Sequence, residues 1–185
     1  MQTYLTPEIQ ARLEEYFGGR DILECLGVDF RGVGAPYLGT CKPGPGLPGK
    51  ADSYDEWGVG YIRQENPSGG AYSEARELAL AEIKTLDDVE NYPWPSPDDY
   101  DYSVLPARCD AVSEYAVCFG GAGIPDIVNG VGRGRGMEQV LIDIVTNDPV
   151  GVAIIDHRVD MYYEHCRRGL QAAGGRIDIL CIGED

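Results

Sequence analysis

The sequence has no apolar run of the roughly eighteen residues that a membrane-spanning helix needs. It also lacks a basic N-terminal segment followed by an apolar one, so we expect no secretion signal. Its six cysteines form no C-x-x-C pair and no regular spacing, which argues against a zinc ribbon or a disulfide framework. These absences predict a cytoplasmic protein with reduced thiols and no membrane partner.

Basic residues are scarce, with 15 Lys and Arg against 31 Asp and Glu, and the formal net charge is −16. Long-range repulsion from this charge opposes binding to nucleic acid or to an anionic membrane surface. The sequence contains neither G-x-x-x-x-G-K-[ST] nor G-x-G-x-x-G, so it carries no nucleotide-binding fingerprint. We therefore expect a small-molecule partner and no nucleic acid.

The composition is that of a folded domain, with 43% apolar and 25% charged residues in 185. Residues 1–27 are expected to form lead helices, because Thr6 and Pro7 are typical of a helix start and a second short helix is predicted at Asp21–Leu26. The alternating segment Val28–Val33 then predicts a first strand. The whole chain, 1–185, is expected to belong to a single domain.

Residues 34–110 read as an irregular excursion. Prolines and glycines in Lys42–Gly49 exclude regular structure there. The stretches 57–63 and 71–72 predict a hairpin around the turn residues 66–70. Thr85, followed by two aspartates, predicts the start of a helix, and Ser96-Pro97 predicts another.

Residues 111–185 alternate between strand and helix. A strand is predicted at Tyr115–Phe119, a helix at Gly136–Val145, a long helix from the cap Asp148 to Gly174, and a strand at Ile177–Ile182. This order is typical of a parallel α/β arrangement. Three strands are far fewer than the eight of a closed barrel, which takes about 250 residues, so the fold class predicted is an incomplete barrel.

Several segments carry a resemblance to a known family. The sequence resembles the uroporphyrinogen decarboxylase family, and within it the methyltransferase-like members more than the tetrapyrrole decarboxylase. The similarity extends over nearly the whole chain as diffuse motifs. These motifs are LGVDFRGV, DEWGV at 55–59, TLDDVENYPWPSPDDYDY at 85–102, YAVCFGGAG at 115–123, GRGMEQVLIDIVTNDP at 134–149 and GGRIDILCIGED at 174–185.

The resemblance implies the N-terminal part of a TIM-type (β/α)8 barrel, with about three barrel strands and an inserted hairpin region. It implies methyl transfer with a corrinoid protein and a thiol, and zinc ligands in the later half of such proteins. An alternative is tetrapyrrole decarboxylation, although the R-Q-A-G-R-like stretch of those enzymes is absent here. Another alternative is a non-catalytic, truncated protein.

The same interpretation gives expectations for this chain on its own. We expect it to hold no cofactor, to be inactive alone, and to self-associate through an open sheet edge at 177–182. The resemblance further implies an acidic catalytic group, Asp185, where a strand ends. The competing interpretation of Asp185 is a solvated terminus.

Five further residues are candidates for substrate binding. Arg133 and Arg135 alternate with glycines in GVGRGRGME at 130–138, which favours an anion held by guanidinium and backbone N–H groups. The alternative is a structural corner between strand and helix at 135–138. Asp55 and Trp57 lie near the site entrance in the resemblance, with packing of Trp57 as the alternative, and Phe119 ends its strand.

Two histidines, His157 and His165, lie eight residues apart on the long predicted helix. This spacing turns them about 80° apart at 3.6 residues per turn, which does not suit a shared metal ion. Both are predicted to be surface groups. Asp156, Asp160 and the pair Glu164 and Arg168 are expected to form a solvated charged face of the same helix.

Overall fold

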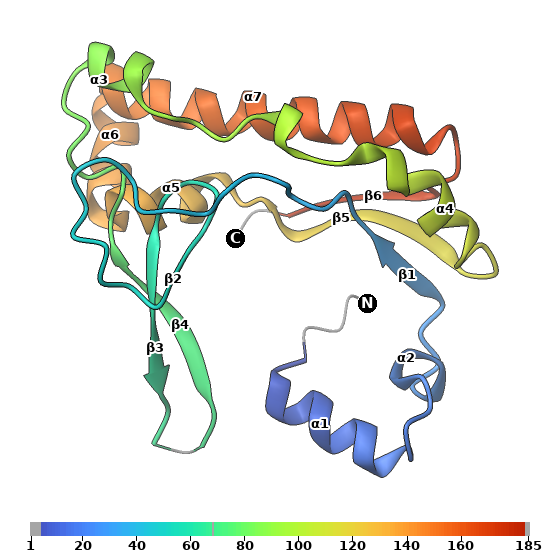
Figure 1. The fold of residues 1–185 in the computed structure, drawn as a ribbon. Helices are drawn as coiled ribbons and strands as arrows, with labels where there is room; N and C mark the ends of the chain where they lie inside the picture. Colours follow the sequence, from blue (N-terminus) through green and yellow to red (C-terminus); the bar gives the residue numbers. More distant parts are fainter. Residues whose placement is uncertain (1–4, 68, 184–185) are drawn as a thin grey trace.

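The structure, a computed structural model, describes residues 5–67 and 69–183. It is a mixed α/β fold in which a parallel sheet has the strand order β1-β5-β6 (Figure 1). The strands are β1 (Phe30–Val33), β5 (Ala116–Pro125) and β6 (Ile179–Gly183). All three predicted strands are confirmed, and they run parallel in sequence order. This arrangement is compatible with part of a barrel.

The lead helices are confirmed as α1 (Pro7–Tyr16) and α2 (Ile22–Cys25). Helix α1 begins as predicted, because the Thr6 hydroxyl accepts a hydrogen bond from the Ile9 backbone N–H. Its N-terminal turn reaches the turn of a hairpin, since a Cβ at Gly70 would lie 3.3 Å from the Glu8 carboxylate.

The excursion contains a second, antiparallel sheet of β2 (Ser53–Tyr54), β3 (Gly60–Glu65) and β4 (Ala71–Glu77). The predicted hairpin is therefore confirmed, although its second strand is longer than expected. After this sheet, residues 85–104 form a return segment that leads back along the helices. It carries α3 (Leu86–Asn91), η1 (Pro97–Asp99) and η2 (Tyr102–Val104). As predicted, Thr85 caps α3, through a reciprocal hydrogen-bonded pair with Asp88. Figure 1 shows this segment running along the long helix.

Four more helices complete the fold: α4 (Leu105–Asp110), α5 (Ile127–Arg135), α6 (Met137–Thr146) and α7 (Pro149–Ala173). The helices α6 and α7 were predicted, whereas α4 and α5 were not. The predicted strand-to-helix corner at 135–138 is wrong, because Gly136, at φ 93°, joins two helices.

Glycine is needed at two positions of α5 because the helix packs too closely against its neighbours to leave room for side chains there. A Cβ at Gly130 would overlap the Arg158 guanidinium, and one at Gly134 would lie 2.9 Å from Leu80. Backbone N–H groups here are used by the helix, as in the bond from Gly130 to the Asp126 carbonyl. The glycines thus lie within a helix and not before one, which does not support the predicted anion cradle.

Two apolar cores hold the layers together. The larger joins the excursion to α5, α6 and α7, with Val59, Leu80 and Ile154 at its centre. The smaller lies between the parallel sheet and the helices α4 and α7 and includes Val117 and Phe119. Packing of the excursion onto the helices thus fixes the loops that border the carboxyl ends of the parallel strands.

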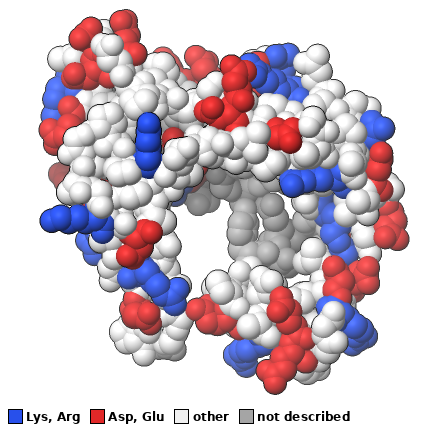
Figure 2. All heavy atoms as spheres, in the orientation of Figure 1, with Lys and Arg blue, Asp and Glu red and all other residues white. Residues whose placement is uncertain are grey.

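None of the helices in the described part of the chain is long and apolar enough to cross a bilayer. Acidic and basic side chains are interspersed over the face shown in Figure 2. Acidic side chains gather at the end that carries α3, which has Asp87 and Asp88 in its first turn.

Candidate functional site

A strained acidic residue lies where β5 ends. Asp126 is 6% exposed and adopts a left-handed backbone conformation, with φ at 45°. Such a conformation is costly for a residue other than glycine and often marks a functional position. The Asp126 carboxylate forms an ion pair with Arg133, which lies about two turns into α5. Parallel α/β folds assemble their sites at this end of the strands.

A second polar pair comes from the excursion. The Asp55 carboxylate accepts hydrogen bonds from the backbone N–H groups of Trp57 and Val59, both at 2.9 Å. Its other oxygen accepts the Tyr61 hydroxyl at 2.9 Å. The Asp55 carboxylate therefore stabilises the turn that precedes β3 and also orients the Tyr61 hydroxyl.

Arg133 is in contact with Asp126 and close enough to Asp55 and Tyr61 for their charges to influence one another. Its charge stabilises the ionised form of Tyr61, and the charges of Asp126 and Asp55 act on Arg133 in turn. We call Asp55, Tyr61, Asp126 and Arg133 the carboxyl-end cluster. About 41% of the Arg133 side chain is exposed, so a ligand can reach this side chain from solvent.

Arg133 also borders a cavity of about 350 Å³. The walls of the cavity come from β4, from the residue after it and from the corner between α5 and α6. Its other lining residues are Ala75, Leu78, Asn129, Gly132, Gly136 and Met137.

Burial sets the protonation behaviour of the cluster. Loss of hydration raises the pKa of Asp55, against the hydrogen bonds from Val59 and Tyr61 that lower it. Burial, together with the Asp55 charge, also raises the pKa of Tyr61 well above its usual value. Tyr61 therefore remains a hydroxyl donor at neutral pH, while Arg133 supplies a fixed positive charge. The cluster can orient an anionic or hydrogen-bond-accepting group.

Trp57 lies beside this cluster in a stack of aromatic and cationic groups. The Arg158 guanidinium carbon lies 4.8 Å from the centre of the Trp57 ring and 5.0 Å from that of Tyr162. Arg158 also donates from Nε to the carbonyl oxygens of Pro125 and Asp126, at 3.2 and 3.0 Å. Trp57 is 5% exposed, as its packing interpretation predicts, and Arg158 ties α7 to the end of β5.

The structure does not bring Arg135 into the cluster. Its guanidinium forms an ion pair with Asp143 of α6 and donates to the carbonyl oxygens of Leu80 and Ile83. The Arg135 and Asp143 side chains are 7% and 2% exposed, so this pair is buried. Arg135 therefore serves as a structural link, and its contacts do not support the predicted substrate-binding role.

Phe119 faces the helical layer. Its ring packs in the smaller core and lies 5.5 Å from the His165 ring of α7, nearly parallel to it. At 1% exposure Phe119 has no accessible surface for a substrate in this structure, so its contacts do not support the predicted binding role. The alternation of side chains along β5 places Val117 and Phe119 on the same, helix-covered face. Asp185, the predicted catalytic residue, lies outside the described residues.

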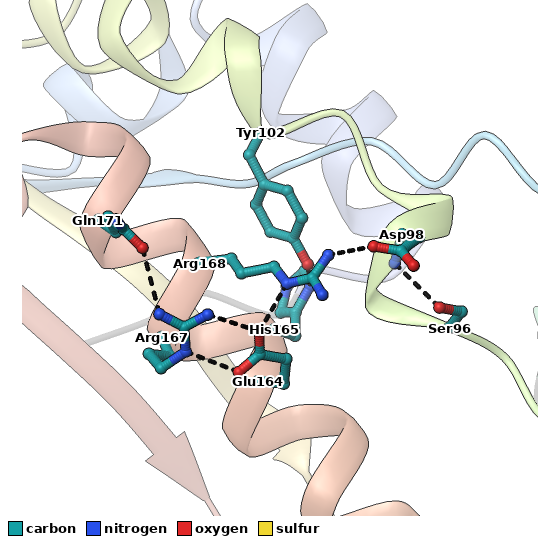
Figure 3. Close-up of polar contacts among 8 residues, drawn as sticks. All are labelled: Ser96, Asp98, Tyr102, Glu164, His165, Arg167, Arg168 and Gln171. Atoms are coloured by element: carbon teal, nitrogen blue, oxygen red, sulfur yellow. Dashed lines mark hydrogen bonds and ion pairs between the residues drawn. The ribbon is translucent and has the colours of Figure 1, made fainter.

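A polar clamp holds the return segment of the excursion on α7 (Figure 3). Glu164 accepts from Arg167 and Arg168, and Arg168 also pairs with Asp98 of η1. Four residues after Asp98 in the same segment, the Tyr102 hydroxyl is hydrogen-bonded to Nδ1 of His165. The predicted pair of Glu164 and Arg168 is confirmed, and it fastens η1 to the helix.

The prediction for His165 is wrong and that for His157 is confirmed. His165 is 6% exposed because Phe119 and Tyr102 cover it, whereas His157 is exposed and stacks on Trp94 with ring centres 4.6 Å apart. The helical spacing alone could not show that Phe119 and Tyr102 cover His165 and leave His157 exposed.

Thiols come together at one place in the parallel sheet. The Sγ atoms of Cys118 and Cys181, on neighbouring strands, lie 3.4 Å apart. Within the described residues, however, no group of three or more His, Cys, Asp or Glu side chains is arranged to hold a metal ion. The described residues therefore offer no zinc site of their own, and the resemblance places the zinc ligands in the later half of such proteins.

Comparison with family models, curated proteins and solved structures gives no match to this chain.

Sequence reasoning found Asp55, Trp57 and Arg133 but missed three residues around them. Asp126 directly follows the last residue of β5, a position that a longer strand prediction would have singled out. Tyr61 and Arg158 reach the site only through the tertiary fold, and neither stands in a recognisable motif.

Proposed function

We propose that this chain forms the first part of a TIM-type barrel enzyme of the uroporphyrinogen decarboxylase family, closest in kind to its methyltransferase-like members. The order of elements supports the proposal: lead helices, a strand, an excursion with a hairpin, then two strands joined by helices. Three neighbouring parallel strands in sequence order are also what the start of such a barrel contains.

The observation that carries the functional proposal is the position of the carboxyl-end cluster. Asp126 and Arg133 follow β5, and the excursion adds Asp55 and Tyr61 to them. Barrel enzymes bind their substrates at this end of the strands. A half-exposed guanidinium beside a phenol donor suits a small molecule with a carboxylate or similar anionic group. Arg133 would bind that group and Tyr61 would orient it.

In the proposed activity, a corrinoid partner supplies the methyl group and a small thiol accepts it. Zinc activates the thiol in such enzymes, but the described residues supply no ligand set for it. The role proposed for this chain is therefore to bind and orient the small-molecule substrate. Tetrapyrrole decarboxylation is the alternative, because the substrate carboxylates of that reaction would also suit Arg133.

Because this chain alone is expected to be inactive, activity assays on the complete barrel protein that the proposal implies distinguish these alternatives. The protein would be incubated with methylcobalamin, zinc and a panel of small thiols, and the thioether product measured by mass spectrometry. A parallel reaction with uroporphyrinogen would measure the loss of carboxyl groups. We expect thioether formation. Decarboxylation alone would replace the proposal by the alternative, and the absence of both products would overturn an enzymatic role.

Substitution of Arg133 tests the assignment of the site. Charge-assisted hydrogen bonds contribute about 1.5–3 kcal/mol, so Arg133→Gln should lower kcat/KM by about tenfold or more. Arg76→Gln is the matched control, because Arg76 is an exposed arginine of β4 that pairs only with Glu74 among the described residues. Equal activity of the two variants would remove Arg133 from the site.

A further inference from the structure

A second cavity, of about 300 Å³, lies between the loop 39–44 and the segment 92–99. This volume is at the lower end of the range for small-molecule sites, which is about 300–1,000 Å³. The cavity does not include Arg133 or Tyr61, so it is separate from the carboxyl-end cluster. Four aromatic and two acidic residues line it: Tyr37, Trp57, Tyr92, Trp94, Glu56 and Asp99.

The aromatic wall is fixed before any ligand binds. The Tyr92 hydroxyl donates to the Trp57 carbonyl oxygen at 2.6 Å, and Trp94 Nε1 donates to the Val89 carbonyl oxygen at 2.7 Å. The rings of Tyr92 and Trp94 are 4.5 Å apart, and those of Trp57 and Trp94 are 6.1 Å apart. Rings held in this way bind a ligand without a further loss of side-chain entropy.

Glu56 gives the cavity an available negative charge. It is half-buried, and its one hydrogen-bond partner among the described residues is the Tyr162 hydroxyl, at 3.5 Å. That distance is at the outer limit for a hydrogen bond, so the carboxylate retains most of its capacity to accept. Asp99 adds a second carboxylate, one oxygen of which accepts from the Ser96 backbone N–H at 2.9 Å.

We infer that this cavity binds a small organic cation, such as a quaternary ammonium ion. One face of Trp57 lies against Arg158 and one face of Trp94 is covered by His157. The other ring surfaces that line the cavity would attract the cation, and an adjoining carboxylate adds a direct charge interaction. The net charge of −16 favours the approach of such a ligand. Lys42 lies at the border of the cavity, but its side chain is exposed and can turn toward solvent. The inference does not depend on the proposed methyl transfer.

Choline and its neutral carbon isostere, 3,3-dimethylbutan-1-ol, test the inference directly. Both tryptophans of the chain line this cavity, so intrinsic fluorescence reports on it, and titration calorimetry gives an independent affinity. We expect saturable choline binding, and we expect the isostere to bind at least about tenfold more weakly because it lacks the charge that the rings and the carboxylate attract. Equal binding of both probes, or no saturable choline binding by calorimetry, would overturn the inference.

Charge removal at the carboxylate completes the test. Glu56→Gln should raise the choline Kd by about tenfold. Glu65→Gln removes the same charge from an exposed position at the end of β3 and should leave the Kd unchanged. A parallel weakening in both variants would assign the effect to net charge and overturn the site. The comparison of choline with its isostere on the unmodified chain stands even if Glu56→Gln fails to fold.

Discussion

The hydroxyl of Tyr102 lies 3.0 Å from Nδ1 of His165, although 63 residues separate them in the sequence. Burial raises the pKa of Tyr102 to about 12 and lowers the pKa of His165. At neutral pH the tyrosine therefore carries its proton and the imidazole does not, so we assign the hydroxyl as donor to Nδ1. The pair joins η2 to α7 beside the ion pairs of the clamp.

Acidification should weaken the fold through His165. Its pKa in the folded state lies below the ordinary 6.5, so the unfolded chain takes up the proton first as the pH falls. The stabilisation is complete above about 6.5 and is lost as the pH falls toward the folded-state pKa. Thermal melting between pH 7.5 and 5.0 should show this loss, and His165→Gln should show a smaller one.

The exposed histidine provides the control for that experiment. His157→Gln should retain the full decrease in Tm on acidification, because His157 is exposed on the same helix. An identical pH dependence in the wild type and in His165→Gln would contradict the assignment of a buried, neutral imidazole.

Removal of Asp143 should destabilise the protein strongly. Its carboxylate is the one acidic partner of the buried Arg135 among the described residues, so Asp143→Ala leaves a buried charge with only carbonyl partners. Breaking such a pair costs about 3–5 kcal/mol of unfolding free energy, measurable by urea denaturation. Glu74→Gln breaks the exposed pair with Arg76 and should cost less than about 1 kcal/mol. A similar small cost for both variants would contradict the structural role of Arg135.

Local signals made much of the fold predictable from sequence. Thr6, Thr85 and Asp148 cap helices through their own side chains, and a cap depends only on residues within one turn. The strands were found because their apolar runs are bounded by glycines and polar residues. Helix α5 was missed because its glycines oppose helix formation, and only packing against Arg158 and Leu80 explains them.

The candidate site was less predictable for the same reason. Asp55 and Arg133 were singled out by their neighbours in sequence, but the partners that define their roles are Tyr61 and Asp126. Burial also separates residues that look alike. Arg133 and Arg135 stand two positions apart in one motif, yet on a helix they point in different directions, and only Arg133 remains half-exposed.

Oxidation should link Cys118 to Cys181. Their Sγ atoms are 3.4 Å apart, but Cys118 lies opposite Ile179 and Cys181 opposite Gly120, so a disulfide bond of about 2.05 Å also requires a local shift of the two strands. Diamide takes two electrons and two protons from the thiols and becomes the hydrazine. Because burial and Cys181 raise the pKa of Cys118 to about 11, we expect the reaction to be slow at neutral pH and faster at higher pH.

Peptide mapping under non-reducing conditions would identify the link. It should vanish in Cys181→Ser and persist in Cys166→Ser, which removes a thiol from α7 instead. Recovery of both thiols in reduced form after prolonged treatment would contradict the proximity of the two strands at this point.

Gly169 permits α7 to lie directly on β5, and alanine there should disrupt the contact. A Cβ at Gly169 would overlap the ring of Phe119, which is 1% exposed. Overpacking of this kind costs about 1–3 kcal/mol, and this loss should exceed the gain of about 1 kcal/mol in helix propensity. Urea denaturation should therefore show Gly169→Ala to be less stable than the wild type. Gly34→Ala should be nearly neutral, since nothing lies within 4 Å of its Cβ.

Adding Phe119→Leu to Gly169→Ala should cost less than the two single changes together, because the smaller side chain removes the overlap. Strict additivity would mean that Gly169 and Phe119 do not touch, and that α7 is held on the sheet by other contacts.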